Sequence, residues 1–160
     1  MKLDDKTIFV TGSNRGLGKA LVEALLKQPV KKIYAAARRI EDLPTFNDRR
    51  VVPIKLDIGD PKQIQEAVTQ AQDIDMLINN AGVLSYAGVV SGESCLLKQD
   101  MEVNYFGTLN DSAAIFAKDF SGLLLEKSAK IIYAPWVRGS PSRPATLVLC
   151  PARGIKLVAQ

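Results

Sequence analysis

The 160-residue sequence contains no histidine. Its absence excludes a catalytic triad or general base built on imidazole, and it excludes any histidine-ligated metal site. The two cysteines, Cys95 and Cys150, are far apart and lack the spacing of a metal-binding motif. Free thiols in a reducing compartment are the default interpretation of such cysteines. We therefore predict no metal site.

Long apolar runs and basic blocks are also missing. The first six residues are polar and no apolar run is long enough to cross a bilayer, so we expect a cytoplasmic protein with neither a signal peptide nor a membrane partner. The net charge is only +4 and both signs are dispersed along the chain. Without a basic block interleaved with aromatic residues, nucleic acid is not an expected partner. A hydrophobic content of 47% suits one domain with a sizeable core.

What the sequence does contain is a strand–turn–helix pattern near its start. Residues 6–12 predict a strand that is buried on both faces. Residues 16–28 predict a helix, which Pro29 ends because proline cannot continue the hydrogen-bond ladder. The apolar residues at helical spacing predict the buried stripe of this helix, namely Leu17, Ala20, Leu21, Ala24 and Leu25.

The turn itself reads Thr11-Gly12-Ser13-Asn14-Arg15-Gly16-Leu17-Gly18. Gly12 allows a sharp turn out of the strand, Gly16 lets the backbone approach a pyrophosphate, and Gly18 allows close packing of helix on strand. The N–H groups and the dipole at the start of the following helix favour a bound anion. A purely structural turn is the alternative interpretation of the glycine pattern taken alone.

The second predicted strand, residues 32–37, ends at Arg38-Arg39. In a doubly wound sheet this strand end lies beside the adenosine ribose of a dinucleotide. An acidic side chain there selects a free 2′-hydroxyl, whereas an arginine accommodates a 2′-phosphate. The acid is absent and two arginines are present, with Arg15 as a further positive charge, so NADP is the predicted cofactor. A solvated surface pair is the alternative for the two arginines.

The rest of the chain continues to alternate strands with helices. The cap Asp60-Pro61 marks the start of one helix. A loop over 83–95 is followed by a long apolar helix over 96–118. This alternation is typical of an α/β protein with a parallel sheet. We predict a doubly wound, Rossmann-like parallel sheet, incomplete at its C-terminal side, in one dinucleotide-binding domain over 1–160. The further predicted strands are 51–56, 74–78 and 129–134, and residues 40–50 are predicted to be a polar loop.

Four motifs in order make residues 1–134 resemble the short-chain dehydrogenase/reductase family. They are the glycine turn, Asp57 after the third strand, Asn79-Asn80-Ala81-Gly82 after the fourth, and Val103-Asn104 in the long helix. The resemblance implies an NADP(H)-dependent oxidoreductase that transfers a hydride between the nicotinamide and a small carbonyl or alcohol substrate. It also implies that copies of the chain associate through the long helix as a homo-oligomer.

The resemblance further implies roles for single residues. Asp57 contacts the adenine, and the turn after the fourth strand lines the ribose region. Asn104 holds a water in a proton relay and is the catalytic candidate. Two structural alternatives stay open, Asp57 as a turn former and Asn80 as a partner for the backbone of a neighbouring strand. The implied cofactor-binding residues are Gly12, Ser13, Asn14, Arg15, Gly16, Leu17, Gly18, Arg38, Asp57, Asn80, Ala81 and Gly82.

The tail over 135–160 departs from the family pattern. The family's chemistry needs a tyrosine proton donor and a lysine one helical turn later, in a Tyr-x-x-x-Lys motif. Residues 145–153 occupy that place and contain neither residue type. Tyr133 is a weak substitute for the missing acid. The resemblance therefore implies an impaired oxidoreductase, and the alternative is a non-catalytic NADP(H)-binding module, a sensor or a truncated product.

Residues 146–151 predict a sixth strand. Only about ten residues separate it from the fifth, and a parallel crossover normally takes a dozen or more. We therefore expect this run either to pair antiparallel at the edge of the sheet or to stay loosely ordered.

Overall fold

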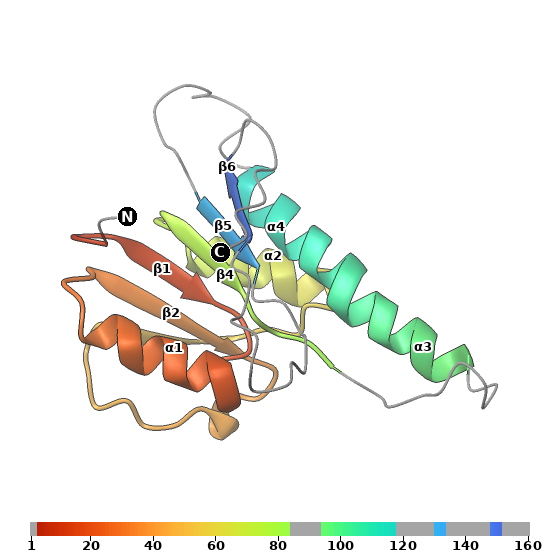
Figure 1. Ribbon diagram of the computed structural model, residues 1–160, viewed down its shortest axis with the longest axis horizontal. Coiled ribbons are helices and arrows are strands. Elements are labelled where there is room, and N and C mark those ends of the chain that lie inside the picture. Colours follow the sequence, from red (N-terminus) through yellow and green to blue (C-terminus); the bar gives the residue numbers. More distant parts are fainter. Residues whose placement is uncertain (1–2, 84–93, 118–129, 134–147, 152–160) are drawn as a thin grey trace, which may run out of the picture.

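The computed structural model describes residues 3–83, 94–117, 130–133 and 148–151 (Figure 1). Its strands are β1 (Thr7–Val10), β2 (Lys32–Ala37), β3 (Val51–Lys55), β4 (Met76–Asn79), β5 (Lys130–Tyr133) and β6 (Val148–Pro151). Its helical segments are α1 (Gly16–Leu26), η1 (Ile40–Asp42), α2 (Pro61–Gln70), α3 (Ser94–Met101), η2 (Glu102–Gly107) and α4 (Thr108–Ala117).

The strands form one sheet in the order β3-β2-β1-β4-β5-β6. The first five strands pair in parallel. The chain leaves β1 toward β2 and β3 and then returns to β4 on the other side of β1, which is the doubly wound arrangement predicted from the sequence. The sixth strand pairs antiparallel with β5, the first of the two alternatives expected for that run.

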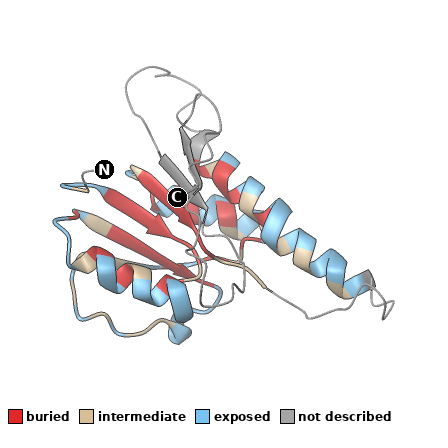
Figure 2. Ribbon diagram, in the orientation of Figure 1, coloured by how far each residue is buried: buried red, intermediate tan, exposed pale blue. Residues whose placement is uncertain are grey.

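Helices cover both faces of the sheet, with α1 on one face and α2 and α4 on the other (Figure 1). As predicted, β1 is buried on both faces (Figure 2). Ile8 and Val10 lie in a cluster with Val22 and Leu25 of α1, whereas Phe9 lies in a second cluster with the apolar side chains of α2. The alternation of side chains along one strand thus joins both helical layers to a shared core.

The buried face of α1 differs from the predicted stripe. Gly18 is buried, and Val22 and Leu25 follow it at helical spacing. A Cβ added at Gly18 would overlap the carbonyl oxygen of Gly12, so the helix makes its nearest approach to the sheet at this residue. This contact sets the rotation of the helix about its axis. It leaves three residues of the predicted stripe exposed, namely Leu17, Ala20 and Ala24.

The long helix predicted over 96–118 is not a continuous α-helix. It begins at Ser94, and residues 102–107 form a π-helical turn between α3 and α4. Gly107 closes this turn, and a Cβ there would come within 2.7 Å of the carbonyl oxygen of Ile58. Such π turns are frequent at functional sites. The predicted loop over 40–50 likewise contains the short helical turn η1. Among the described residues, no helix is long and apolar enough to cross a bilayer.

Asp111 is an acidic residue within the core. It lies on α4, which packs against α2, and its side chain has no exposed surface. Neither carboxylate oxygen has a hydrogen-bond partner among the residues that the structure describes. Burial in these apolar surroundings raises the pKa of Asp111 from 3.8 to about 7.

We predict that Asp111 makes the free energy of unfolding depend on pH. Because the pKa is raised in the folded state, the contribution of the neutral acid is present below pH 4 and is lost as the pH rises toward about 7. Asp111→Asn keeps the shape and removes the titration. At pH 8 this variant is expected to be more stable than the native chain by a few kcal/mol. The gap is expected to narrow by about 1.4 kcal/mol for each pH unit between about pH 7 and pH 5. Urea unfolding of both chains at pH 5 and pH 8 measures the gap, and a gap independent of pH would contradict the prediction.

Candidate functional site

The carboxyl ends of β1, β2, β3 and β4 open into one cleft of about 1090 Å³. Its walls are the glycine turn after β1, the arginines after β2, residues 57–60 after β3 and residues 80–83 after β4, with Gln99 and Val103 from the long helix. In doubly wound sheets, ligands bind beyond the carboxyl ends of the strands where the strand order reverses. Here that point lies between β1 and β4, so the cleft is the candidate ligand site.

The hydroxyl of Thr11 connects the two strands at this point. Its Oγ1 accepts hydrogen bonds from the backbone N–H groups of Asn80 and Ala81, each at 2.9 Å. The same oxygen lies 3.5 Å from the carbonyl oxygen of Ile78, and the N–H of Thr11 donates to that carbonyl at 3.0 Å. Thr11 is 1% exposed, so these bonds form without competition from water. The sequence motif includes Thr11, but its role in orienting the turn after β4 was not predicted.

Asn80 strengthens the same connection through its side chain. Its Nδ2 donates to the carbonyl oxygens of Thr11 at 3.0 Å and Gly12 at 3.1 Å. These are bonds to the backbone of a neighbouring strand end, the structural role that the sequence left open for Asn80. The residue also lines the cleft. Gly12 has a φ of +66°, and a Cβ there would lie 2.9 Å from the Cα of Ala81, so the two turns pack backbone against backbone.

The start of α1 has the features of an anion-binding position. No side chain caps this helix terminus and the first turn contains no acidic residue. Its N–H groups and the positive end of its dipole are therefore available to a ligand. Gly16 has a φ of +55°, and a Cβ built on it would meet no atom within 4 Å, so its backbone borders open space in the cleft. These residues fit the phosphates of a dinucleotide.

Two of the predicted cofactor-binding residues are buried beneath this turn. Ser13 has no exposed surface, and its hydroxyl donates to the carbonyl oxygen of Val10 at 2.8 Å. Its N–H donates to the carbonyl oxygen of Ala36 on β2 at 2.9 Å. Ser13 and Gly18 do not line the cleft, so in this structure they hold the turn in place from below. The other predicted cofactor-binding residues line the cleft, namely Gly12, Asn14, Arg15, Gly16, Leu17, Arg38, Asp57, Asn80, Ala81 and Gly82.

The wall next to β2 carries positive charge. Arg38 and Arg39 line the cleft there, Arg15 lines it from the glycine turn, and Asp42 of η1 is the acidic residue paired with Arg39. Arg39 donates from Nε to Oδ2 of Asp42 at 2.8 Å. Within the described part of the chain, no ion pair joins Arg15 or Arg38 to an acid. Two guanidinium groups at the cleft are thus available to an anionic ligand.

Asp57 lines the cleft after β3 and also shapes its own loop. Its Oδ1 accepts a hydrogen bond from the N–H of Gly59 at 3.0 Å, and its own N–H donates to Oε1 of Gln63 at 3.1 Å. The turn-forming role left open for Asp57 is therefore present in the structure. The side chain of Asp60 caps α2 by accepting from the N–H of Lys62 at 2.9 Å, as the sequence predicted.

Asn104 lies in the π turn, and both the oxygen and the nitrogen of its side-chain amide bind the backbone of one residue, Val83. Its Oδ1 accepts from the N–H of Val83, and its Nδ2 donates to the carbonyl oxygen of Val83, both at 2.8 Å. The pair fixes the chain just after the turn that follows β4. Asn79 makes a second link to the same helix, since its Nδ2 donates to Oγ of Ser112 at 3.0 Å. The long helix is therefore connected to the cleft wall at two levels.

Tyr133, the weak substitute for the missing acid, is the last residue of β5. Its backbone pairs in register with Asn79 of β4, at the carboxyl edge of the sheet. The stretch over 145–153, where the family's tyrosine and lysine belong, lies outside the described residues except for 148–151.

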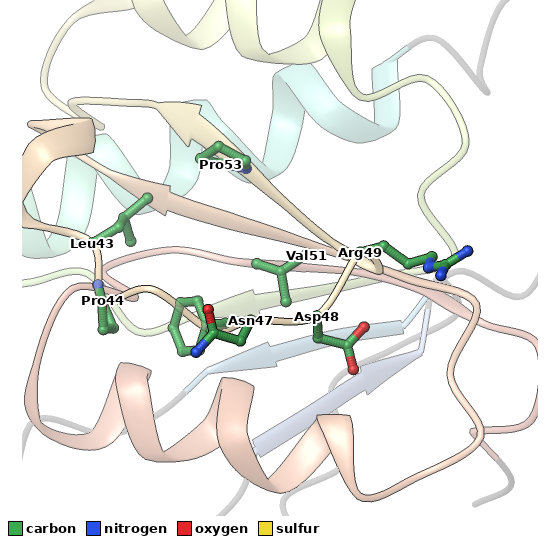
Figure 3. A pocket seen from close by; sticks show the side chains of 8 residues that line it. Leu43, Pro44, Asn47, Asp48, Arg49, Val51 and Pro53 are labelled. Atoms are coloured by element: carbon green, nitrogen blue, oxygen red, sulfur yellow. The ribbon is translucent and has the colours of Figure 1, made fainter.

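A second hollow of about 300 Å³ lies outside the cleft, beside β3 and the loop before it (Figure 3). It contains none of the predicted site residues. Its acidic residue, Asp48, forms an ion pair with Arg50 at 2.8 Å, which holds the pKa of Asp48 at about 2. Arg50 in turn donates to the carbonyl oxygen of Leu26 at the end of α1 at 2.8 Å. Arg50 therefore caps the carboxyl end of α1, and Asp48, which lines the hollow, holds Arg50 in place. The charges at the hollow thus serve the fold.

Comparison with known proteins points to one family. Residues 6–137 match the family model described as short chain dehydrogenase. Oxidoreductase BOA17 of Botryotinia fuckeliana is 36% identical over 118 residues, which are 69% of this chain and 43% of that protein. An NADP-dependent 3-hydroxy acid dehydrogenase of Schizosaccharomyces pombe is 37% identical over 93 residues, 51% of this chain and 36% of that protein. The matches thus cover less than half of either relative.

A solved structure supports the same assignment. The crystal structure of a short chain dehydrogenase from Burkholderia cenocepacia, in complex with NADP, superposes with a TM-score of 0.74. The two chains are 38% identical, and the superposition covers 83% of this chain and 54% of the other.

We predict that the Thr11 hydroxyl contributes strongly to the stability of the site. Thr11→Val keeps the shape of the side chain but leaves the N–H groups of Asn80 and Ala81 without their acceptor. An unpaired buried group costs about 1–3 kcal/mol, so urea unfolding is expected to show a loss of roughly 2–4 kcal/mol. The matched control Thr11→Ser keeps the acceptor and is expected to lose about 1 kcal/mol, for the methyl group. Equal losses in both variants would contradict this role of the hydroxyl.

Proposed function

The chain belongs to the short-chain dehydrogenase family, and from this premise we propose that it binds NADP(H) in the cleft at the carboxyl edge of its sheet. The observation that carries the proposal is that Arg38, after β2, and Arg15, in the glycine turn, both line the cleft and have no ion-pair partner among the described residues. An acid at the end of β2 would select a free 2′-hydroxyl, and arginine is there instead. The NADP complex of the Burkholderia cenocepacia relative supports this choice of cofactor.

In this proposal each wall of the cleft holds one part of the dinucleotide. The start of α1 at Gly16 receives the pyrophosphate. Arg38 and Arg15 bind the 2′-phosphate through charge-assisted hydrogen bonds, since planar guanidinium groups suit phosphate oxygens. Asp57 lies on the adenine side. The turn Asn80–Gly82, held by Thr11, lines the ribose on the nicotinamide side.

The proposed reaction class is hydride transfer between the nicotinamide and a small carbonyl or alcohol. The bound cofactor supplies or accepts the hydride. Asn104 fixes the backbone of Val83 beside the cleft, and by family resemblance it holds a water in a proton relay. None of the tyrosines in the sequence is followed by a lysine four residues later. Without that pair, the motif lacks the lysine charge that lowers the pKa of the family's tyrosine proton donor. We therefore propose that this chain turns over poorly.

A non-catalytic NADP(H)-binding module is the second candidate. The observation that favours it is that the cofactor-site motifs are present and the catalytic motif is not. The chain has the glycine turn, the basic wall and the turn after β4, whereas its sequence lacks Tyr-x-x-x-Lys. Both candidates need the same cofactor site, and turnover separates them.

Cofactor binding tests the basic wall. In Arg38→Asp the guanidinium is replaced by a repelling carboxylate, so NADPH affinity is expected to fall by roughly ten- to a hundredfold while NADH affinity changes little. Titration of NADPH and NADH fluorescence measures both affinities. Arg49→Asp makes the same change of charge outside the cleft and is the matched control. Equal affinity of the native chain for the two cofactors would remove the support for the arginine argument.

Turnover tests the missing acid. With a panel of aldehydes and ketones, the native chain is expected to oxidise NADPH no faster than the uncatalysed background, because no tyrosine–lysine pair lowers the barrier to proton transfer. Absorbance at the nicotinamide band measures the rate. Clear turnover that disappears in Tyr133→Phe would contradict the prediction and assign the proton donor to Tyr133.

A further inference from the structure

The cofactor cleft contains a charge arrangement that the proposed binding mode does not use. The basic wall next to β2 includes an acid, Asp42, whose Oδ2 accepts a hydrogen bond from Nε of Arg39 at 2.8 Å. Both residues line the cleft beside Arg38. Arg39 therefore differs from Arg38 and Arg15, for which the described residues offer no ion-pair partner.

The geometry of η1 produces this pair. The N–H of Asp42 donates to the carbonyl oxygen of Arg39 at 3.2 Å, and the N–H of Leu43 donates to that of Ile40 at 3.0 Å. In a 3₁₀ turn the side chains at i and i+3 are superimposed, so the turn returns Asp42 to the side of Arg39. If the chain continued after β2 without this turn, the carboxylate of Asp42 would not lie beside Arg39.

The pair is exposed enough to be changed by a ligand. The side chains of Arg39 and Asp42 are 74% and 37% exposed. Exposed ion pairs of this kind contribute only about 0.2–1 kcal/mol. The bond to Asp42 uses only Nε of Arg39, and an anion in the cleft can compete with Asp42 for this guanidinium.

We propose that Asp42 is a specificity-determining residue, which limits the preference of the site for NADP(H) over NAD(H). It holds Arg39 in an internal pair, and it places a negative charge on the wall that receives the 2′-phosphate. Both effects weaken the binding of NADP(H), which carries the 2′-phosphate, and leave the binding of NAD(H), which lacks it, unchanged. The inference rests on the proposed function, because it requires a dinucleotide in the cleft.

The size of the effect follows from the exposure of the pair. The Debye length is about 8 Å at physiological salt, so charges a few ångströms apart near a protein surface are only partly screened. Removing an exposed partner of this kind changes binding by about 0.2–1 kcal/mol, so a gain of roughly 1.4- to fivefold in NADPH affinity is expected. The gain should shrink as salt is raised.

The test compares Asp42→Asn with the matched control Glu41→Gln in the full chain. Glu41 lies on the same turn, is exposed, and does not line the cleft, so both variants lose one negative charge and only one lies at the site. Dissociation constants for NADPH and NADH are measured by fluorescence titration at low and high salt. Asp42→Asn is expected to bind NADPH roughly 1.4- to fivefold more tightly with NADH unchanged. Glu41→Gln is expected to leave both constants unchanged.

A double-mutant cycle assigns the gain to Arg39. Arg39→Gln is expected to weaken NADPH binding more in the Asp42→Asn background than in the native chain, because only there is the guanidinium released. A gain for NADH equal to that for NADPH, an equal gain in Glu41→Gln, or additive effects of Arg39→Gln and Asp42→Asn would each overturn the inference.

The same titrations separate this inference from the proposed function. A native chain that binds NADPH, combined with an Asp42→Asn variant of unchanged affinity, overturns the role of Asp42 alone. A folded native chain that binds neither cofactor overturns the proposed function, and the role of Asp42 with it.

Discussion

The cleft depends on one buried hydroxyl. Thr11 directly follows β1 and accepts hydrogen bonds from the backbone of the turn after β4, and Asn80 returns two bonds to the backbone of Thr11 and Gly12. This exchange holds together the two strands between which the strand order reverses. The glycine turn and the Asn80–Gly82 turn are thereby fixed as facing walls. The helix dipole, the basic wall and the long helix act on a ligand only because these two turns keep their positions.

Charge is distributed unevenly around the cleft. The start of α1 has no capping side chain and no acid, so its dipole is directed into the cleft without compensation. Arg39 is paired with Asp42 after β2, whereas no acid of the described residues pairs with Arg15 or Arg38, which also line the cleft. A charged acid buried in the core is costly, and Asp111 is accommodated by a raised pKa. The site thus combines an uncapped helix start with a core that is expected to lose stability as the pH rises toward about 7.

Much of this arrangement could be predicted from the sequence because it depends on local patterns. The parallel strands are short apolar runs, the cap Asp60-Pro61 starts α2, and the glycine turn has its own spacing, so the order and type of most elements were correct. The errors occurred where distant segments meet. The face of α1 is set by the contact of Gly18 with Gly12, and the π turn contains Gly107, which lies against Ile58. No periodicity within either helix reports such contacts.

The sequence by itself determined the strand–turn–helix order, the absence of histidine, and the basic end of β2, because these follow from residue type and spacing along the chain. Only the tertiary structure decided what each motif residue contacts. It buried Ser13 beneath the turn, used the amide of Asn104 on Val83, and paired Arg39 with Asp42. The physical reason is that a hydrogen bond or an ion pair depends on distance in space. Residues 21 positions apart, such as Val83 and Asn104, become neighbours only once the sheet and its helices have packed.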